Sequence, residues 1–552
     1  MEKRAVLAIV LSLLIIVVWT YVFSPPPPPD TPVPQREAQE VPQTEPSPPP
    51  LTQEAASALP ASEATQVLVD TGVARLVLTS QGAGVKEVEL LDYRATLAKD
   101  APPVIIAPVP GVAMPSLETR LQLQGRTVSL GQVVFTPSVN EIRLSPNQPQ
   151  ASVTFHGKTE DGVAVQRTYL FQHGSYVFAV STEVAGASSA TANAMTLVWG
   201  PGFYENGSEG EQRQGQTAPL PRGYIGGKIF HKTPKEVGEV SEERGNVSWA
   251  ALGDTYFAAV LIPQEPPAEA MMVRRVRQDA LEIGVRTPLD REHRRQTVRV
   301  YVGPKAQTVL RQIDPSLGKY LIDLGFFSVL ARPMLQFLIL INQWVHNYGV
   351  TIILVTILIK IVLWPLTQSS YKSMQAMQRL QPKMKELQAI YKDDRQALNR
   401  AMMQLYRDEK VNPMGGCLPM ILQIPVFFAF YNALLYSIEL RHAPFICWEE
   451  PIFWLGRGIC DLSVYDPTYI TPILMGVSMF FQQKMSPTSA DPMQAKMMQF
   501  MPLFFLMFFL WAPAGLVIYW LVNNVLSIAQ QLAINRMGRR PLTAKAEVAS
   551  KE

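Results

Sequence analysis

The hydrophobic and polar positions of the chain follow different patterns in different regions. Long apolar runs of the kind that cross a membrane as helices lie near the start of the chain and again after residue 342. Between residues 66 and 310, short apolar runs alternate with polar positions, most cleanly over Thr297–Val302, and glycine and proline separate the runs. The pattern predicts a polytopic α-helical membrane protein with one large β-sandwich domain.

The amino-terminal apolar run, Ala5–Phe23, follows two basic residues and carries no charge. It is long enough to span a bilayer, and no cleavage site of small residues follows it. We therefore expect an uncleaved transmembrane anchor over residues 1–24 with its amino end in the cytoplasm. The proline-rich residues 25–65 predict a disordered linker. The β-sandwich, expected over residues 66–310, then lies on the extracytoplasmic side.

The segment 320–342 is apolar, but Asp323, Arg332 and Pro333 interrupt it. This pattern predicts an amphipathic helix that lies in the membrane interface. A core of five membrane helices is expected over residues 343–536, which gives six spans when the anchor is included. The apolar runs of the core are Val350–Thr367, Cys417–Tyr436, Ile470–Phe481, Phe500–Trp511 and Leu516–Ile534. Two of these runs have only twelve residues, roughly 18 Å of helix, which predicts local thinning of the bilayer.

Charged loops set the expected topology. The polar segment 368–412 carries nine basic and five acidic residues, which predicts a cytoplasmic helical hairpin that turns near Lys392–Arg395. Its methionines are expected either in the small core of the hairpin or on a contact surface. Residues 439–466 form an acidic outer loop, and the basic tail, residues 537–552, places the carboxyl end in the cytoplasm.

The first span of the core contains a charged residue. Lys360 lies inside an apolar run, where a lysine costs roughly 2.5–3.5 kcal/mol on the insertion scale. The surrounding isoleucine, leucine and valine residues offset that cost, so the helix still inserts. Thr356 lies four residues earlier and makes the same helix face polar. Two interpretations remain open: the lysine snorkels to the interface, or it provides a charge inside the membrane.

Other spans also carry polar residues. Gln423 lies within the third span, and Trp520, Asn524 and Ser527 follow at i, i+4 and i+7 on one face of the last span. Single asparagine and glutamine residues in membrane helices often only hold helices together. The whole set, taken with the lysine and the threonine of the first core span, favours a hydrophilic cavity among the helices.

Composition and motifs exclude several classes of function. The formal net charge of +3 is too small for nucleic acid binding by bulk charge. The six histidines show no metal-ligand spacing, and neither a phosphate-binding loop nor a nucleophile turn occurs. We expect no catalytic residue, no metal and no cofactor, and therefore a protein that is not an enzyme.

The sequence contains three cysteines. Cys447 and Cys460 lie in the outer loop, on the oxidising side of the membrane, and proline and glycine between them can turn the chain back. We expect a disulfide bond between these two, with a pair of packed free thiols as the alternative. Cys417 lies at the inner end of its span and is expected to stay reduced.

Three long motifs stand out in the second half of the chain. They read WPLTQSSYKSMQAMQRLQPKMKEL (364–387), KVNPMGGCLPMILQIPVFFAFY (410–431) and DPTYITPILMGVSMFFQQKMSPTSADPMQAKMMQFMP (466–502). These motifs closely resemble the YidC/Oxa/Alb family of membrane protein insertases, and the anchor, tether and β domain resemble the Gram-negative layout. The resemblance implies a groove that is open to cytoplasm and lipid and closed to the outside.

The resemblance also implies roles for particular residues. Lys360 occupies the place of a positive residue, usually arginine, that attracts the polar or acidic part of a substrate. Thr356 matches a substrate-contacting threonine, and Trp520 falls where a tyrosine is usual, with Tyr519 beside it. The residues expected to line the groove are Thr356, Lys360, Gln423, Tyr519, Trp520, Asn524 and Ser527.

The function implied by the resemblance is that of a membrane protein insertase and chaperone in the bacterial inner membrane. Nascent hydrophobic segments would enter the groove and leave sideways into lipid, with or without the Sec translocon, and the cytoplasmic loops would contact the ribosome and the signal recognition machinery. A Ser–Lys membrane peptidase and a solute transporter are the alternatives. The sequence shows no fixed serine partner for Lys360 and no internal repeat of the kind that transporters often have.

Overall fold

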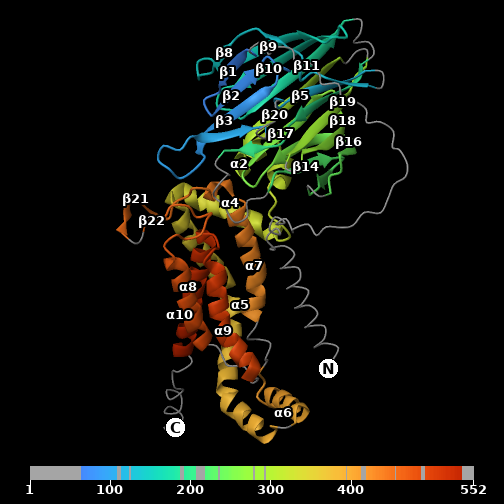
Figure 1. The fold of residues 1–552 in the computed structure, drawn as a ribbon. Helices are drawn as coiled ribbons and strands as arrows, with labels where there is room; N and C mark the ends of the chain where they lie inside the picture. The colour runs from blue at the N-terminus through green and yellow to red at the C-terminus, as the bar shows by residue number, and fades with distance from the viewer. Residues whose placement is uncertain are drawn as a thin grey trace, which may run out of the picture. The chain divides into compact units, whose positions relative to one another are not determined.

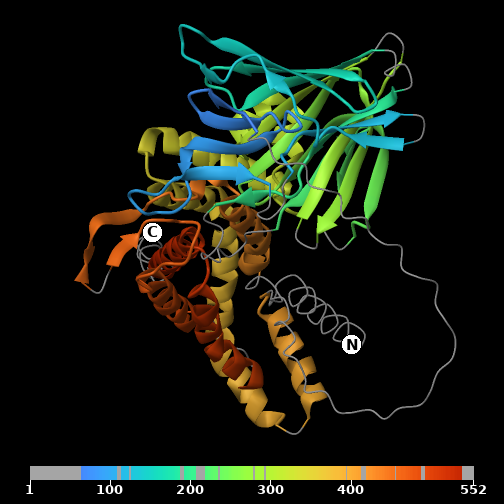
Figure 2. The same ribbon diagram turned by 45° about the horizontal axis from the view of Figure 1, so that its top comes forward.

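The computed structural model describes residues 64–108, 114–123, 126–186, 192–206, 218–233, 236–277, 280–290, 294–392, 394–411, 418–453, 456–485 and 492–537. The predicted anchor, nearly all of the predicted linker, Cys417 and the tail from residue 538 lie outside these ranges. Figures 1 and 2 show the described residues as sheets built from the first half of the chain and helices built from the second half.

The β domain consists of two sheets, as expected for a sandwich (Figure 1). The smaller has the order β13-β4-β3-β2-β1-β8 and is antiparallel except for the parallel pair β1–β8. Its strands are β1 (Gln66–Asp70), β2 (Ala74–Thr79), β3 (Val85–Arg94), β4 (Pro103–Ala107), β8 (Glu141–Arg143) and β13 (Tyr204–Glu205).

The larger sheet has the order β6-β5-β12-β19-β18-β16-β17-β20-β11-β10-β9-β7, and β14 and β15 are attached beside β16. Its strands are β5 (Glu118–Leu123), β6 (Arg126–Ser129), β7 (Thr136–Pro137), β9 (Gln150–Lys158), β10 (Ala164–Gln172), β11 (Val177–Ala185), β12 (Ala192–Trp199), β14 (Leu220–Ile225), β15 (Lys228–His231), β16 (Val240–Gly253), β17 (Phe257–Glu265), β18 (Ala268–Arg277), β19 (Ala280–Pro288) and β20 (Arg295–Pro304). Alternation places Val298 and Val300 of β20 in one core with Val67 and Val69 of β1, so the core lies between the sheets.

The helix predicted over residues 320–342 has different bounds in the structure. Three helices follow the sheets: α2 (Gln307–Ile313), α3 (Pro315–Tyr320) and α4 (Ser328–Val345). Between α3 and α4, Gly325 adopts a φ of +66° and its N–H donates to the Asp323 carboxylate at 2.9 Å. This left-handed turn ends the helical path, because it suits glycine and cannot continue an α-helix. The amphipathic helix therefore begins only at Ser328.

The helical core contains α5 (Tyr348–Ile390), α6 (Arg395–Asp408), α7 (Leu418–Leu435), η3 (Ile438–Leu440), β21 (Ile446–Ile452), β22 (Gly456–Ile459), α8 (Ile470–Met485), α9 (Pro492–Phe509) and α10 (Ala514–Met537). A helix is present at each apolar run predicted for the core. By length and hydropathy, two described segments qualify as spans, Tyr348–Pro365 and Ala514–Arg536, while Gln423–Leu435 and Phe500–Phe509 are shorter apolar stretches. The number of six spans stays a prediction.

Helices α8 and α9 are longer than the twelve-residue runs predicted for them. They have 16 and 18 residues, roughly 24 and 27 Å of helix. The sequence pattern underestimates them because both helices continue through polar flanks, to Met485 in α8 and from Pro492 in α9. The bilayer thinning expected from these two spans is correspondingly smaller.

Helix α5 does not end where the predicted span ends. The predicted span 350–367 and the first arm of the cytoplasmic hairpin form one helix of 43 residues. Asn347 caps its start by accepting from the Val350 N–H at 3.1 Å. The chain turns after Ile390, and Asp394 caps α6, close to the predicted turn.

The methionines of the hairpin divide between its core and its surface. Met384 and Met402 form a small cluster with Leu380, and each is less than a tenth exposed. Met403 is half exposed. The core interpretation therefore holds for the first two, and the contact-surface interpretation still applies to Met403.

Candidate functional site

Lys360 lies in the α5 span and points toward α10. Its Nζ donates a hydrogen bond to Ser527 Oγ at 2.7 Å, and Ser527 in turn donates to the carbonyl oxygen of Asn523 at 2.7 Å. Lys360 is half-buried, and Ser527 is 2% exposed. No carboxylate among the described residues pairs with the ammonium group. The contact holds the charge between two helices, which is not the arrangement expected of a snorkelling lysine.

Further polar contacts join α5 and α10 on the carboxyl-terminal side of Lys360 and Ser527. Gln530 Nε2 donates to Thr367 Oγ1 at 2.9 Å, and Gln375 Nε2 donates to Asn535 Oδ1 at 3.2 Å. Together with the lysine–serine contact, these two pairs form a row that we call the polar seam. The seam lies on one face of α5 because its members there are seven and eight residues apart, about two helical turns.

Thr356 and Asn524 make contacts away from Lys360. Thr356 Oγ1 donates to the Ile352 carbonyl of its own helix at 2.7 Å and is 1% exposed. Asn524 Nδ2 donates to Ser478 Oγ of α8 at 3.1 Å. Asn524 therefore holds α10 to α8, and the hydroxyl of Thr356 is satisfied by its own backbone.

Tyr519 and Trp520 pack against different aromatic residues. Tyr519 is 1% exposed and stacks on Phe430, with ring centroids 4.4 Å apart. Trp520 is half-buried and packs edge-on against Phe427 at 4.9 Å and near Phe509 at 5.4 Å. Its indole Nε1 is buried with no hydrogen-bond partner among the described residues. Trp520 thus keeps an unused donor, whereas Tyr519 is a packing residue in this structure.

The structure brings together only part of the predicted set. Lys360 and Ser527 touch, and Gln423 is half-buried on α7. The role of every predicted residue toward a substrate stays a prediction. Sequence reasoning misses Thr367 and Ser478, which bond to the last helix from α5 and α8. Thr367 could have been found from its position seven residues after Lys360, on the same helix face.

The outer loop contains the disulfide bond expected from the sequence. Cys447 and Cys460 are joined, with their Cα atoms 4.8 Å apart. Strand β21 pairs antiparallel with β22, and Cys447 lies opposite Gly458. The disulfide therefore closes a β-hairpin rather than an irregular loop.

Arg441, which follows η3, makes a second contact of the outer loop. Its guanidinium donates to the Glu205 carboxylate at 3.1 Å and to the Arg94 carbonyl at 2.8 Å. The Arg441 and Glu205 side chains are 3% and 5% exposed. Nearby, burial raises the pKa of Glu439. The arginine thus ties the outer loop to the β domain through a buried, charge-assisted contact.

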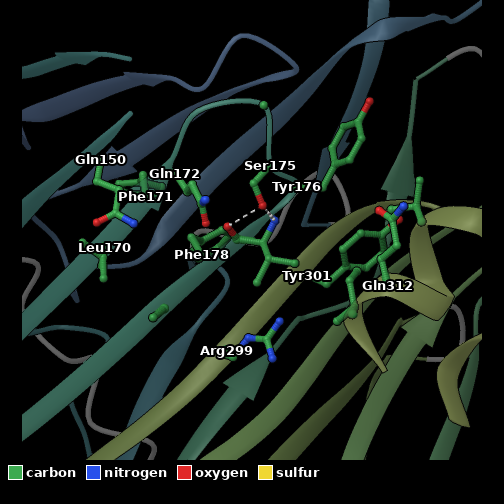
Figure 3. Close-up of a pocket in the computed structure, with 15 residues that line it drawn as sticks. Gln150, Leu170, Phe171, Gln172, Ser175, Tyr176, Phe178, Arg299, Tyr301 and Gln312 are labelled. Atoms are coloured by element: carbon green, nitrogen blue, oxygen red, sulfur yellow. Dashed lines mark hydrogen bonds between the residues drawn. The ribbon is translucent and has the colours of Figure 1, made fainter. Parts of the chain in front are cut away.

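The β domain also has a surface cavity of about 420 Å³, lined by β10, β11, β20 and α2 (Figure 3). Its polar lining consists mainly of Gln150, Gln172, Gln312 and Arg299. Ser175 Oγ donates to the Val177 carbonyl at 3.2 Å. The lining residues thus offer amides, hydroxyls and one guanidinium as hydrogen-bonding groups.

Comparisons with known proteins match both halves of the chain. Residues 66–337 match the family described as YidC periplasmic domain, and residues 340–541 match the family described as 60Kd inner membrane protein. The membrane protein insertase YidC of Geobacter sulfurreducens is 39% identical over 560 residues, which cover 97% of this chain and 98% of that protein. The membrane protein insertase YidC of Citrifermentans bemidjiense is 36% identical over 571 residues, which cover 97% and 99%. A solved structure of an active YidC insertase has 16% identity and a TM-score of 0.35, covering 84% of this chain and 92% of that one.

These matches and the fold define a class, that of inner-membrane proteins with a strand-rich periplasmic domain. The identity with the two bacterial relatives extends over almost the full length of each chain. The chain belongs to the YidC family.

Proposed function

We propose that the chain is a membrane protein insertase that passes hydrophobic segments of nascent proteins into the bilayer of the inner membrane. The observation that carries the proposal is Lys360, a cation held by Ser527 between membrane helices without a paired carboxylate among the described residues. A substrate segment with a polar or acidic flank meets a counter-charge there. The contact lowers the cost of moving that flank into apolar surroundings.

The polar seam supports entry from the cytoplasm. It extends from Lys360 toward the cytoplasmic ends of α5 and α10 and supplies hydrogen-bonding groups along that path. Trp520 and Gln423, which are both half-buried, are proposed to contact the substrate. The apolar part of the segment then moves sideways into lipid, driven by burial of its apolar area. The proposed mechanism includes no step that uses a cofactor.

The finer topology is part of the same proposal. The distribution of basic residues supports six spans, with both termini and the α5–α6 hairpin in the cytoplasm. The hairpin is the proposed contact for the ribosome and the signal recognition machinery, because it exposes Met403 and carries many basic residues. The Sec translocon is the proposed partner within the membrane.

A Ser–Lys peptidase deserves comparison because Lys360 contacts Ser527. In such an enzyme, a neutral lysine accepts the proton of an accessible serine. Here the lysine donates to the serine, which is 2% exposed and gives its own proton to Asn523. The geometry therefore favours a positioning contact for Lys360 over a nucleophilic serine.

The test is reconstitution of the full-length protein in liposomes with a small single-span substrate that has an acidic flank. Insertion is measured by protease protection, together with substrate cleavage and solute flux. We expect insertion without cleavage or flux.

Lys360→Arg should retain insertion because it keeps the positive charge. Lys360→Ala should weaken insertion several-fold because it removes the charge. Lys360→Glu should weaken insertion most because it reverses the sign of the charge.

The matched control is a substrate whose flank has no acidic residue, which should respond much less to the same variants. Normal insertion of the acidic substrate by Lys360→Glu would show that the electrostatic role is wrong. Cleavage that disappears in Ser527→Ala would instead establish a peptidase.

A further inference from the structure

The hairpin β21–β22 carries apolar side chains that the described structure leaves uncovered. Phe453 is 95% exposed, and Ile446 and Ile452 are 48% and 43% exposed. We call these three residues the hairpin patch. Two of them lie at the ends of β21 and the third directly follows it, and this exposed apolar surface marks a contact with something outside the described chain.

The hairpin patch is carried by a constrained element. The disulfide between Cys447 and Cys460 closes the base of the hairpin. The ring of Trp448 lies over Gly458, where an added Cβ would come within 2.8 Å of it and where φ is +78°. Because the disulfide and this ring contact hold the two strands together, the patch cannot readily turn its apolar side chains inward.

Hydrogen bonds fix the base of the β21–β22 hairpin beside the start of α5, the first core span. Asn347, which caps α5, donates through Nδ2 to the Phe445 carbonyl at 2.9 Å. The Phe445 N–H donates to the Ile459 carbonyl at 3.0 Å, and Ile459 is buried in the helical core. The apolar stretch of α5 begins at Tyr348, the next residue after the cap. The hairpin therefore starts where the span meets the periplasmic interface.

In Figures 1 and 2 the hairpin projects sideways from the helical core and does not fold back across α8 or α10. We propose that the hairpin patch inserts into the lipid–water interface of the periplasmic leaflet. The depth of its base, its sideways direction and its exposed phenylalanine all fit a lipid surface, because aromatic and aliphatic side chains are favoured at that interface. The exposed charged residues Glu450 and Arg457 can stay among the headgroups. The inference rests on the membrane placement of α5 and not on insertase activity.

The test measures which medium surrounds position 453. Phe453→Cys is made in a full-length chain that also carries Cys417→Ser, and the new thiol is labelled with an environment-sensitive fluorophore. The native disulfide keeps Cys447 and Cys460 from reacting. In vesicles of phosphatidylethanolamine and phosphatidylglycerol, nitroxide groups on the lipids should quench this label several-fold more than iodide in the water does.

The matched control is Val134→Cys, because Val134 is an apolar residue of the β domain that is 64% exposed. Its label should show the opposite preference, for iodide. Equal behaviour of the two positions would overturn the proposal. A label at position 453 that is shielded from both quenchers would also overturn it, because it would show that protein covers the patch.

Discussion

At the scale of single residues, two lysines show two ways of keeping a cation away from water. Lys360 is held by a serine between membrane helices. Lys305, at the end of the β domain, is buried and donates to the carbonyl oxygen of Asp254. Burial lowers the pKa of Lys305 to about 8, while the nearby Asp254 acts in the opposite direction. Folding therefore disfavours the protonated form of Lys305.

This shift predicts a pH dependence of stability. Between pH 8 and 10.5, the unfolded chain holds the Lys305 proton more tightly than the native chain, so the free energy of unfolding should rise with pH. Relative to Lys305→Met, the gain should be on the order of 3 kcal/mol across this window and absent below it. Urea unfolding of both full-length proteins in detergent at several pH values measures the difference. A difference that is constant from pH 7 to 10.5 would contradict the prediction.

At the scale of elements, the apolar pattern locates the core helices but not their ends. Helix α7 lies almost where the sequence predicts it, because its apolar run ends where the helix ends. Helices α8 and α9 extend beyond their apolar runs because polar residues continue a helix once it leaves the bilayer. The break before α4 depends on the backbone of Gly325, which an apolar pattern does not report.

The candidate site shows the same limit. Spacing along one helix identifies shared faces, such as that of Lys360 and Thr367. It does not identify which helix lies opposite, so the contacts of Lys360 with Ser527 and of Asn524 with Ser478 could not be derived. Cys447 and Cys460 were easier to pair because both belong to one short loop on one side of the membrane.

The disulfide gives a prediction at this scale. Under non-reducing, denaturing conditions, Cys447 and Cys460 should resist alkylation, whereas Cys417 should react. Replacing both with serine should cost the loop roughly 3 kcal/mol in the chain-entropy model. Faster proteolysis within the β21–β22 hairpin would report the lost stability, with the rest of the protein as the internal control. Full alkylation of all three thiols in the unreduced protein would decide against the bond.

The α5–α6 hairpin gives a second prediction at this scale, because it contains two adjacent methionines with different environments. Met402 is 7% exposed and Met403 is 50% exposed. Met402→Ala should destabilise the hairpin by about 2 kcal/mol through lost packing. Met403→Ala should leave stability nearly unchanged and weaken binding to ribosome–nascent chain complexes. Hydrogen exchange of α6 and co-sedimentation measure the two effects; an unchanged co-sedimentation with Met403→Ala would argue against the contact surface.

At the scale of the whole described chain, the β domain and the helical core share one hydrophobic cluster. Trp249 and Tyr301 of the sheets belong to it together with Leu317 of α3, Leu335 of α4 and Ala433 of α7. The buried pair Arg441–Glu205 adds a charged contact. The two parts are therefore coupled in stability even though the candidate site lies only among the helices.

Deletion of residues 66–300, which keeps the chain from Tyr301 onward, tests this separation. Insertion should be largely retained, because Lys360 and the polar seam are untouched. The thermal stability of the core should fall, because the deletion exposes Leu317 and Leu335 and leaves Arg441 without its carboxylate. Protease protection of the substrate and thermal unfolding measure the two effects. Loss of insertion in a core that is correctly folded would contradict the prediction.

The unbroken length of α5 has a mechanical consequence. The helix has 43 residues and would be roughly 64 Å long if straight, and Lys360 lies about 18 Å from its end capped by Asn347. If α5 turns about Asn347 without further bending at Pro365 and Pro382, a sideways displacement of its far end at Ile390 is reduced to about three-tenths at the lysine. At this ratio, a movement of the α5–α6 hairpin by about 10 Å shifts the Lys360 ammonium group by about 3 Å. That shift is enough to separate the ammonium group from Ser527.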